Sequence, residues 1–296
     1  MDEVVVSVLC LAYNHEAWIR DAMEGFVAQQ APFRFEVLVH DDASTDGTAD
    51  IIREYAARYP DLIRPVFQTE NQQSKGIPVS LTFLAPLVRG RYVALCEGDD
   101  YWTDPQKLAR QVAALEAHPE VDICAHATRR RTARGRPAGK VAPRRHDGLL
   151  SAEDVILGGG GRFVATASLL CRTEVWRTWT PMREVLVNDY VLQLQGAARG
   201  GMYYLSDCMA VYRTRVPGSW TRRHSGQRPA HRRTIRRMLE AFDDYTEGRF
   251  HETVSQRLAL YDSDDLLNAG RYLALLSPRR LPTTWLQIHR AFRRLF

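Results

Sequence analysis

The sequence lacks the cysteine and histidine patterns of zinc proteins and disulfide-rich proteins. Its five cysteines stand singly, with no CxxC pair, and its nine histidines form no HExxH motif or Cys/His cluster. No apolar run approaches the ~20 residues that a membrane-spanning helix requires. The chain begins Met1-Asp2-Glu3 directly before an apolar run, which indicates no signal peptide and predicts a cytoplasmic protein with reduced thiols.

The sequence also lacks the glycine-rich motifs that bind phosphate in P-loop and NAD-binding proteins. Neither GxxxxGK[ST] nor GxGxxG follows any apolar run. Lysine occurs only at Lys75, Lys107 and Lys140, so arginine supplies most of the positive charge. Arginine-rich segments at 129–145 and 213–239 contain no acid. Because no aromatic platform accompanies the first of them, we favour a solvated loop there and expect no nucleic-acid partner.

Apolar runs alternate with segments of helical periodicity in the first half of the chain. The chain has 296 residues, enough for one large domain or a domain with an appendage. We expect strands at 4–11, 35–40, 92–96 and 121–127, and helices at 16–29, 51–59, 78–88 and 104–115. This alternation predicts an α/β fold with a mostly parallel sheet flanked by helices on both faces.

The second half of the chain is less regular. Its expected elements are a loop or hairpin at 132–143, strands at 163–171, 203–205 and 209–212, and helices at 189–198 and from 231 to the end. We therefore divide the chain into three parts. Residues 1–128 would form the ligand-binding half of the main domain, 129–228 its second half, and 229–296 a C-terminal helical extension.

Polar side chains follow three of the predicted strands. The strand at 92–96 ends in Glu97-Gly98-Asp99-Asp100, the first strand ends at Tyr13-Asn14, and the second ends at Asp41-Asp42. Adjacent carboxylates cannot be buried cheaply, so they must face water, a cation or a polar ligand. Because open α/β sheets bind ligands at the carboxyl ends of their strands, we expect a binding crevice at this edge.

Five motifs in this order resemble the family 2 glycosyltransferases, which have the GT-A fold. They are residues 6–14, 36–48, 97–108, 188–190 (Asn-Asp-Tyr) and 211–213 (Val-Tyr-Arg). The resemblance spans roughly residues 4 to 221. It implies a Rossmann-like nucleotide-sugar-binding domain with a C-terminal helical appendage. It also implies transfer of a sugar to an acceptor hydroxyl, with inversion at the anomeric carbon.

The acidic motif suits the chemistry of that reaction. Negative charge grows on the diphosphate leaving group, and a divalent cation that bridges the phosphates lowers the barrier. The resemblance assigns Asp100 to Mg²⁺ or Mn²⁺ and Asp99 mainly to the ribose or to the groups around the metal. The other interpretation is that one of the two caps the following helix, but Asp104 already occupies that place.

The resemblance also assigns residues to the nucleotide. Asp42 would bind the edge of a uracil-type base and Tyr13 would flank it, with Ala12 and Asn14 beside them, so we expect a UDP- or dTDP-linked donor. Asp42 could instead serve the turn that contains Ser44, and Tyr13 could be a core residue.

Asp189 matches the catalytic base of the family. It would take the proton from the acceptor hydroxyl as that oxygen attacks. The alternative is an N-cap for the helix at 190–198, and one side chain can partly fill both roles.

One position departs from the family pattern. Many relatives have a metal-binding histidine two residues after the Tyr-Arg pair, and this chain has Arg215 there. Arginine cannot ligate a metal but can grip a diphosphate. We expect Arg215, helped by Arg213, to neutralise the leaving group, and residues 213–226 to act as a lid.

The acceptor is not specified by the sequence. A glycan, a lipid-linked molecule and a small molecule all stay open. The apolar stripe at the C-terminus, with basic neighbours, could lie peripherally on the inner face of the membrane, although we favour docking on the core of the protein; it comprises Trp285, Ile288, Phe292, Leu295 and Phe296. The main functional alternative is a non-catalytic nucleotide-sugar or glycan-binding module of the same fold.

Overall fold

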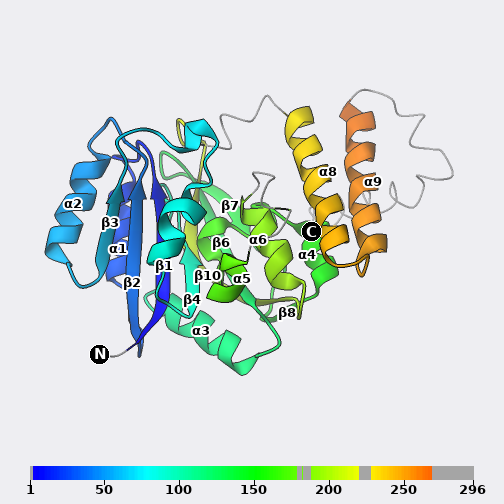
Figure 1. The fold of residues 1–296 in the computed structure, drawn as a ribbon, viewed down its shortest axis with the longest axis horizontal. Coiled ribbons are helices and arrows are strands. Elements are labelled where there is room, and N and C mark those ends of the chain that lie inside the picture. Colours follow the sequence, from blue (N-terminus) through cyan, green and yellow to red (C-terminus); the bar gives the residue numbers. More distant parts are fainter. Residues whose placement is uncertain (1–2, 179–181, 183–187, 220–227, 269–296) are drawn as a thin grey trace. The chain divides into compact units, whose positions relative to one another are not determined.

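The computed structural model describes residues 3–178, 182, 188–219 and 228–268 (Figure 1). The chain divides into two compact units. The first comprises Met1–Trp179 and Asn188–Gly226, and the second comprises Thr180–Val187 and Gln227–Phe296. The predicted C-terminal stripe lies outside the described residues.

A 10-stranded mixed sheet forms the centre of the first unit. Its main path runs β3-β2-β1-β4-β9-β6-β10-β5, with β7 paired to β6 and β8 paired to β10. The strands are β1 (Val4–Ala12), β2 (Arg34–Asp41), β3 (Ile63–Phe67), β4 (Tyr92–Leu95), β5 (Tyr101–Trp102), β6 (Ile123–Thr132), β7 (Pro137–Val141), β8 (Gly148–Leu150), β9 (Leu170–Arg172) and β10 (Met202–Thr214). The neighbours β1, β2, β3 and β4 run parallel, as do β6 and β10, whereas β9 is antiparallel to both β4 and β6.

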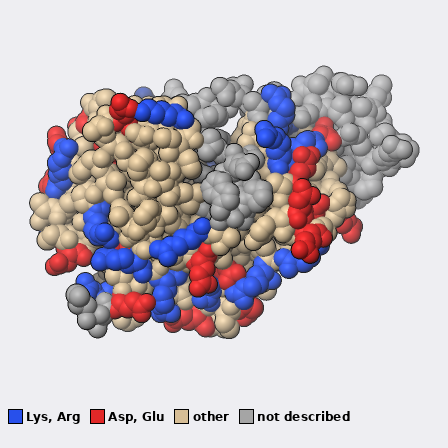
Figure 2. Space-filling model, viewed as in Figure 1, with Lys and Arg blue, Asp and Glu red and all other residues tan. Residues whose placement is uncertain are grey.

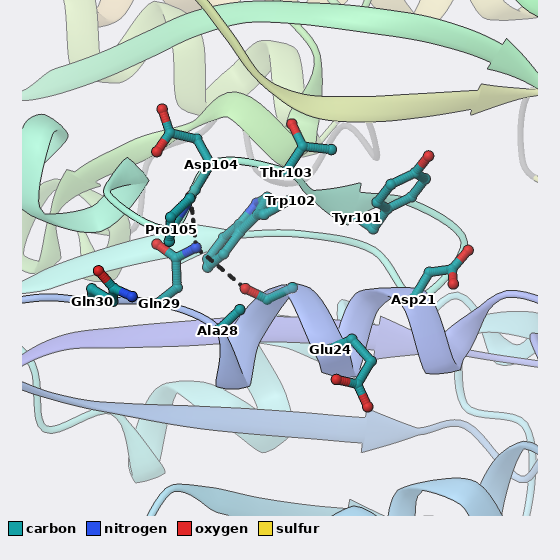
Figure 3. A pocket seen from close by; sticks show the side chains of 11 residues that line it. Asp21, Glu24, Ala28, Gln29, Gln30, Tyr101, Trp102, Thr103, Asp104 and Pro105 are labelled. Atoms are coloured by element: carbon teal, nitrogen blue, oxygen red, sulfur yellow. Dashed lines mark hydrogen bonds between the residues drawn. The ribbon is translucent and has the colours of Figure 1, made fainter.

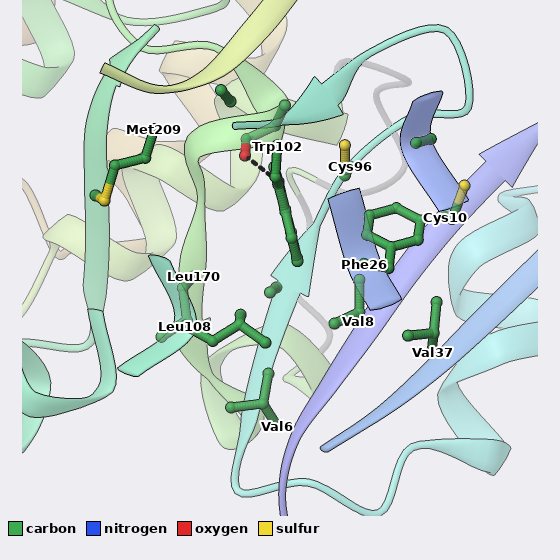
Figure 4. Close-up of a cluster of buried hydrophobic side chains, with 14 of the residues drawn as sticks. Val6, Val8, Cys10, Phe26, Val37, Cys96, Trp102, Leu108, Leu170 and Met209 are labelled. Carbon is green, nitrogen blue, oxygen red and sulfur yellow. Dashed lines mark hydrogen bonds between the residues drawn. The ribbon is translucent and has the colours of Figure 1, made fainter. Parts of the chain in front are cut away.

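Helices α1 (Ile19–Val27), α2 (Thr48–Arg58) and α3 (Lys107–Ala117) cover one face of this sheet (Figure 1). Side chains alternate along a strand, so Val6, Val8 and Cys10 of β1 all face these helices. They join the core around Phe26 and Trp102, whose rings meet edge to face with centroids 5.0 Å apart (Figure 4). Helices α4 (Ala152–Gly158), α5 (Thr173–Arg177) and α6 (Asn188–Ala197) complete the unit. The α/β fold class is confirmed.

Three segments differ from the predicted elements. The helix expected at 78–88 is a π-helical turn, η2 (Ser80–Leu84), and a 3₁₀ turn, η3 (Ala85–Leu87), because Pro86 cannot continue an α-helix. Most of 163–171 is not a strand, since the Ser168 hydroxyl donates to the Ala165 carbonyl in the turn η4 (Thr166–Ser168). The two closing strands are one strand, β10, whose register shifts after Leu205 form a bulge.

The second unit contains two long helices, α8 (Arg228–Tyr245) and α9 (His251–Asn268). Their contact buries Met238, Phe242 and Val254, and the Phe242 ring stacks on Phe250 at 5.7 Å between centroids. The predicted helical extension is therefore present as far as residue 268. In the part of the chain that the structure describes, every helix is too short or too polar to span a bilayer.

A buried carboxylate ties the first two strands to the chain that enters β4. Glu36 is fully buried and accepts hydrogen bonds from the Ser7 hydroxyl (2.7 Å), Arg64 (2.7 Å) and Arg89 Nε (2.8 Å). Burial alone would raise the pKa of Glu36, but the hydrogen bonds from Arg89, Ser7 and Arg64 outweigh it and hold the pKa below its usual range. The carboxylate is therefore stabilising in its charged form.

We expect Glu36→Gln to lower the free energy of unfolding by about 2–3 kcal/mol, less than for a fully buried ion pair because both arginines are partly exposed. The folded pKa is lowered, so the stabilisation is present above about pH 4.5 and is lost as the pH falls. Urea denaturation at pH 7 and pH 4 measures both effects. The matched change Glu54→Gln, at an exposed pair with Arg20, should cause no comparable loss, and equal stability of the two variants would contradict the prediction.

Candidate functional site

The carboxyl ends of β1, β2 and β4 meet at one edge of the sheet, as the sequence predicted. Ala12 of β1 pairs with Asp41 of β2, and Leu9 pairs with Leu95 of β4. The loops that follow these strands therefore lie side by side. They carry Tyr13-Asn14, Asp42 and the turn from Glu97 to Asp100.

The loops after β1 and β2 are joined by reciprocal hydrogen bonds. The Asn14 backbone N–H donates to Ser44 Oγ at 2.9 Å, and the Asn14 side-chain oxygen Oδ1 accepts from the Thr45 N–H at 2.8 Å. Glu16 accepts from the Gly47 N–H at 3.0 Å in the same way. Asn14 has a φ of 54°, a conformation that asparagine tolerates better than most residues. The Asn14 side chain thus binds the neighbouring loop. This contact shapes the edge where Tyr13 lies half-buried.

Asp42 holds a third segment over this edge. Its two carboxylate oxygens accept from the backbone N–H groups of Gln72 (2.8 Å) and Gln73 (3.0 Å), and its own N–H donates to the Ala12 carbonyl at 3.0 Å. Asp42 is 4% exposed. The segment that contains Gln72 and Gln73 was not among the predicted site residues. The only feature of the sequence that marks it is a polar run after a short strand.

The acidic turn after β4 is held from the far strand β10. Asp100 is 1% exposed, and its Oδ1 accepts from the Arg213 N–H at 2.7 Å. The Arg213 guanidinium donates to the Asp99 carbonyl at 2.9 Å, pairs with Asp21 and lies 4.4 Å from the centroid of the Tyr101 ring. The Arg213 backbone therefore positions the Asp100 carboxylate. Its guanidinium positions the Asp99 backbone and links it to Asp21 of α1.

The second oxygen of Asp100 is free. Asp100 Oδ2 is buried and has no hydrogen-bond partner among the described residues. Burial, together with the charges of Asp99 and Glu97, raises the pKa of Asp100 well above its usual range. Burial and the charges of Asp99 and Asp189 raise the pKa of Glu97 to about 8. An added cation would relieve this repulsion, which is the behaviour expected of a metal-binding carboxylate.

Asp189 adds its charge to this acidic cluster. It lies in the first turn of α6, and its charge contributes to the raised pKa of Glu97. Its Oδ1 accepts from the Tyr190 N–H at 2.8 Å. Burial raises the pKa of Asp189. Glu97, to which the sequence assigned no role, is the carboxyl group whose pKa is raised by the charges of both Asp99 and Asp189.

Arg215 lies on the surface beyond this cluster. Its side chain is exposed and its φ is 62°. Much of the predicted lid, from residue 220 onward, lies outside the described residues.

Two cavities lie near the site. One of about 640 Å³ lies between α1 and β5 and is lined by Asp21, Gln29, Tyr101 and Asp104 among others (Figure 3). The other, of about 490 Å³, is lined by Asn14, Glu16, Ala17, Trp18 and Asp46. Basic and acidic side chains are mixed over the described surface that faces the viewer in Figure 2.

No cluster of three or more histidine, cysteine, aspartate or glutamate side chains in the described residues is arranged to hold a metal ion by itself. A cation at Asp100 would need oxygens from elsewhere. Mg²⁺ is commonly held in this way, by one or two carboxylates together with substrate phosphates and water.

Comparisons with known proteins identify the family of the chain. The family model described as Glycosyl transferase family 2 matches residues 7–179. The uncharacterized protein Rv1520 of Mycobacterium tuberculosis is 38% identical over 223 residues, which cover 75% of this chain and 62% of that protein. EpsE of Bacillus subtilis, named as a glycosyltransferase, is 37% identical over 118 residues, 40% of this chain and 41% of its own length. The chain thus spans less than two thirds of these relatives.

Solved structures share the fold. Residues 1–349 of S. aureus TarS in complex with UDP-GlcNAc align with a TM-score of 0.66 at 16% identity, covering 95% of this chain and 78% of that one. The mannosyltransferase PcManGT of Pyrobaculum calidifontis, in complex with GDP-Man and Mn²⁺, aligns with a TM-score of 0.54 at 22% identity, covering 94% and 83%. The predicted GT-A fold is confirmed, and the chain belongs to glycosyl transferase family 2.

Proposed function

We propose that the protein transfers a sugar from a nucleotide-sugar donor to an acceptor hydroxyl, with inversion at the anomeric carbon. The observation that carries this proposal is the acidic turn from Glu97 to Asp100 at the carboxyl end of β4, where Asp100 Oδ2 is buried with no hydrogen-bond partner among the described residues. Two proteins of the same fold were solved with UDP-GlcNAc and with GDP-Man, which supports a nucleotide-sugar donor here. Asp42 and Tyr13 favour a UDP- or dTDP-linked one.

The acidic turn fits a divalent cation. Asp100 would hold Mg²⁺ or Mn²⁺ through its unpartnered Oδ2, with Asp99 beside it. When bound, the cation would supply positive charge to the diphosphate as it leaves. The presence of Mn²⁺ in the PcManGT complex supports this assignment. Arg213 would position the turn, and the exposed Arg215 would contact the diphosphate in place of the family histidine.

Asp189 would act as the base. The acceptor oxygen forms a bond to the anomeric carbon while the bond from that carbon to the diphosphate oxygen breaks and its electron pair leaves with the diphosphate. The hydroxyl proton passes to Oδ2 of Asp189, the carboxylate oxygen that does not accept from the Tyr190 N–H. Burial raises the pKa of this carboxyl, and a higher pKa makes its anion a stronger base for a weakly acidic hydroxyl.

The proposal extends to the acceptor and to the cellular location of the protein. The acceptor is a glycan, a lipid-linked molecule or a small molecule, and we expect a role in polysaccharide or glycan biosynthesis. The protein would work in the cytoplasm, with the C-terminal segment as its contact to the membrane if the acceptor is lipid-linked.

Thermal denaturation with four donors, UDP-glucose, UDP-GlcNAc, dTDP-glucose and GDP-mannose, tests the proposal. One donor with Mn²⁺ should raise the melting temperature, since a ligand at 100 times its Kd stabilises by about 2.7 kcal/mol. In Asp100→Asn the Mn²⁺-dependent part of the shift should disappear, whereas Asp104→Asn, outside the acidic cluster, should keep it. A shift without any donor turnover would favour the non-catalytic binding module, and no shift with any donor would contradict both functions.

A further inference from the structure

Four consecutive glycines, from Gly158 to Gly161, connect α4 to the turn η4. Three of them are required by the local structure. A Cβ on Gly158 would lie 2.2 Å from the Phe163 ring, and one on Gly159 would lie 1.7 Å from the Tyr190 ring. Gly160 has a φ of 83°, and its N–H donates to Gln193 Oε1 at 2.9 Å. The loop is thereby fixed against α6.

Gly161 has neither of these reasons to be glycine. Its φ lies outside the left-handed region, and among the described residues the nearest atom to a Cβ built on it is Asp189 Oδ2, at 3.6 Å, an ordinary van der Waals distance. Every other glycine that the structure describes either has a positive φ or would bring a Cβ within 2.9 Å of a neighbouring atom. Conformation and packing therefore explain all of these glycines except Gly161.

The space beside Gly161 is next to the oxygen that would take the proton. Asp189 Oδ1 accepts from the Tyr190 N–H, and no other described residue donates to Oδ2. An acceptor oxygen must come within about 2.6–3.2 Å of Oδ2. A carbon bonded to this oxygen would then be at about the same distance from Oδ2 as a Cβ at position 161, which is 3.6 Å away, so the two can compete for the same space.

We propose that Gly161 determines acceptor specificity by keeping the space beside Asp189 open for the carbon atoms next to the acceptor hydroxyl. This inference rests on the proposed function. It identifies the acceptor class as secondary alcohols, such as a ring hydroxyl of a sugar. A secondary hydroxyl has two carbon substituents on its carbinol carbon and needs this space more than a primary hydroxyl does.

Simple alcohols test the space directly. The enzyme is incubated with the donor selected by the thermal screen, in water with added methanol or 2-propanol, and mass spectrometry measures the two alkyl glycosides and the free sugar. The unmodified enzyme should form both glycosides. Gly161→Ala should lower the ratio of 2-propyl to methyl glycoside by about tenfold or more, because one methyl group in a confined site changes discrimination by that amount.

Controls separate this effect from a loss of folding. The new Cβ of Gly161→Ala meets no atom of the described residues closer than 3.6 Å, so its melting temperature should match that of the parent. Gly135→Ala adds a methyl group in open space at a φ of 78°; it should lower stability and leave the glycoside ratio unchanged. An unchanged ratio in Gly161→Ala, or a parent enzyme that uses methanol but not 2-propanol, overturns the role of Gly161 alone. A parent enzyme that turns over none of the four donors overturns the proposed function as well.

Discussion

Asp189→Asn should lower the rate of sugar transfer by about 10²- to 10⁴-fold and leave donor binding intact. General bases contribute rate factors of this size, and an amide cannot accept the proton of the acceptor hydroxyl. The fold should be kept, because the amide oxygen of asparagine can still accept the Tyr190 N–H that Asp189 Oδ1 accepts in the parent. Initial rates at saturating donor, together with the donor-induced thermal shift, measure the two effects separately.

The pH profile gives an independent check on the same residue. Burial raises the pKa of Asp189, so the base becomes protonated at a higher pH than an exposed aspartate, and activity should fall with decreasing pH before the usual aspartate range near pH 4 is reached. Asp50→Asn provides the matched control, since Asp50 is also in the first turn of a helix but is exposed and pairs with Arg53. A parent-like rate in Asp189→Asn would remove the residue from the reaction, whatever its position.

The acidic site could be foreseen from sequence because it depends on strand direction. Parallel neighbours end at the same edge, so the side chains after β1, β2 and β4 had to meet, and the structure brings Tyr13, Asp42 and Asp100 to that edge. Glu97 could not be foreseen in the same way. Its importance comes from the approach of Asp189, which is 92 positions later in the chain, and no local pattern encodes that approach.

The sequence identifies a residue type but not the direction of its side chain. Arg213 was expected at the diphosphate because arginine grips phosphate well. In the structure its guanidinium contacts Asp99, Asp21 and Tyr101, because the pairing of Val211 with Tyr101 brings that part of β10 alongside the acidic turn. Asn14 is similar: its side-chain carbonyl accepts from the Thr45 N–H, in a loop 31 residues away. Such assignments depend on which partner is nearest in space.

Lys107→Met should stabilise the protein at pH 7 by about 2–3 kcal/mol. Lys107 is fully buried; its Nζ donates to Gln111 Oε1 at 2.7 Å and lies 4.0 Å from the Trp102 ring centroid. Burial lowers its pKa from 10.5 to about 7. At pH 7 this shift costs about 4 kcal/mol of folding free energy. Methionine fills a similar volume without charge, and the loss of the contacts with Gln111 and Trp102 offsets part of the gain.

The difference in pH dependence between the parent and Lys107→Met measures the contribution of Lys107. Between the folded pKa near 7 and the unfolded pKa of 10.5, the unfolded chain binds more protons, so stability rises with pH. The parent should gain about 1.5 kcal/mol from this residue between pH 7.0 and pH 8.5, and Lys107→Met should lose that gain. The range stops at pH 8.5 because burial raises the pKa values of Cys10, Cys96 and Cys124, so ionisation of these thiols in the unfolded chain opposes folding at higher pH.

Urea denaturation of the parent, Lys107→Met and the exposed control Lys140→Met at both pH values measures the difference. Equal slopes in all three would mean that Lys107 keeps its proton in the folded protein at pH 8.5, and that its contacts with Trp102 and Gln111 compensate for its burial.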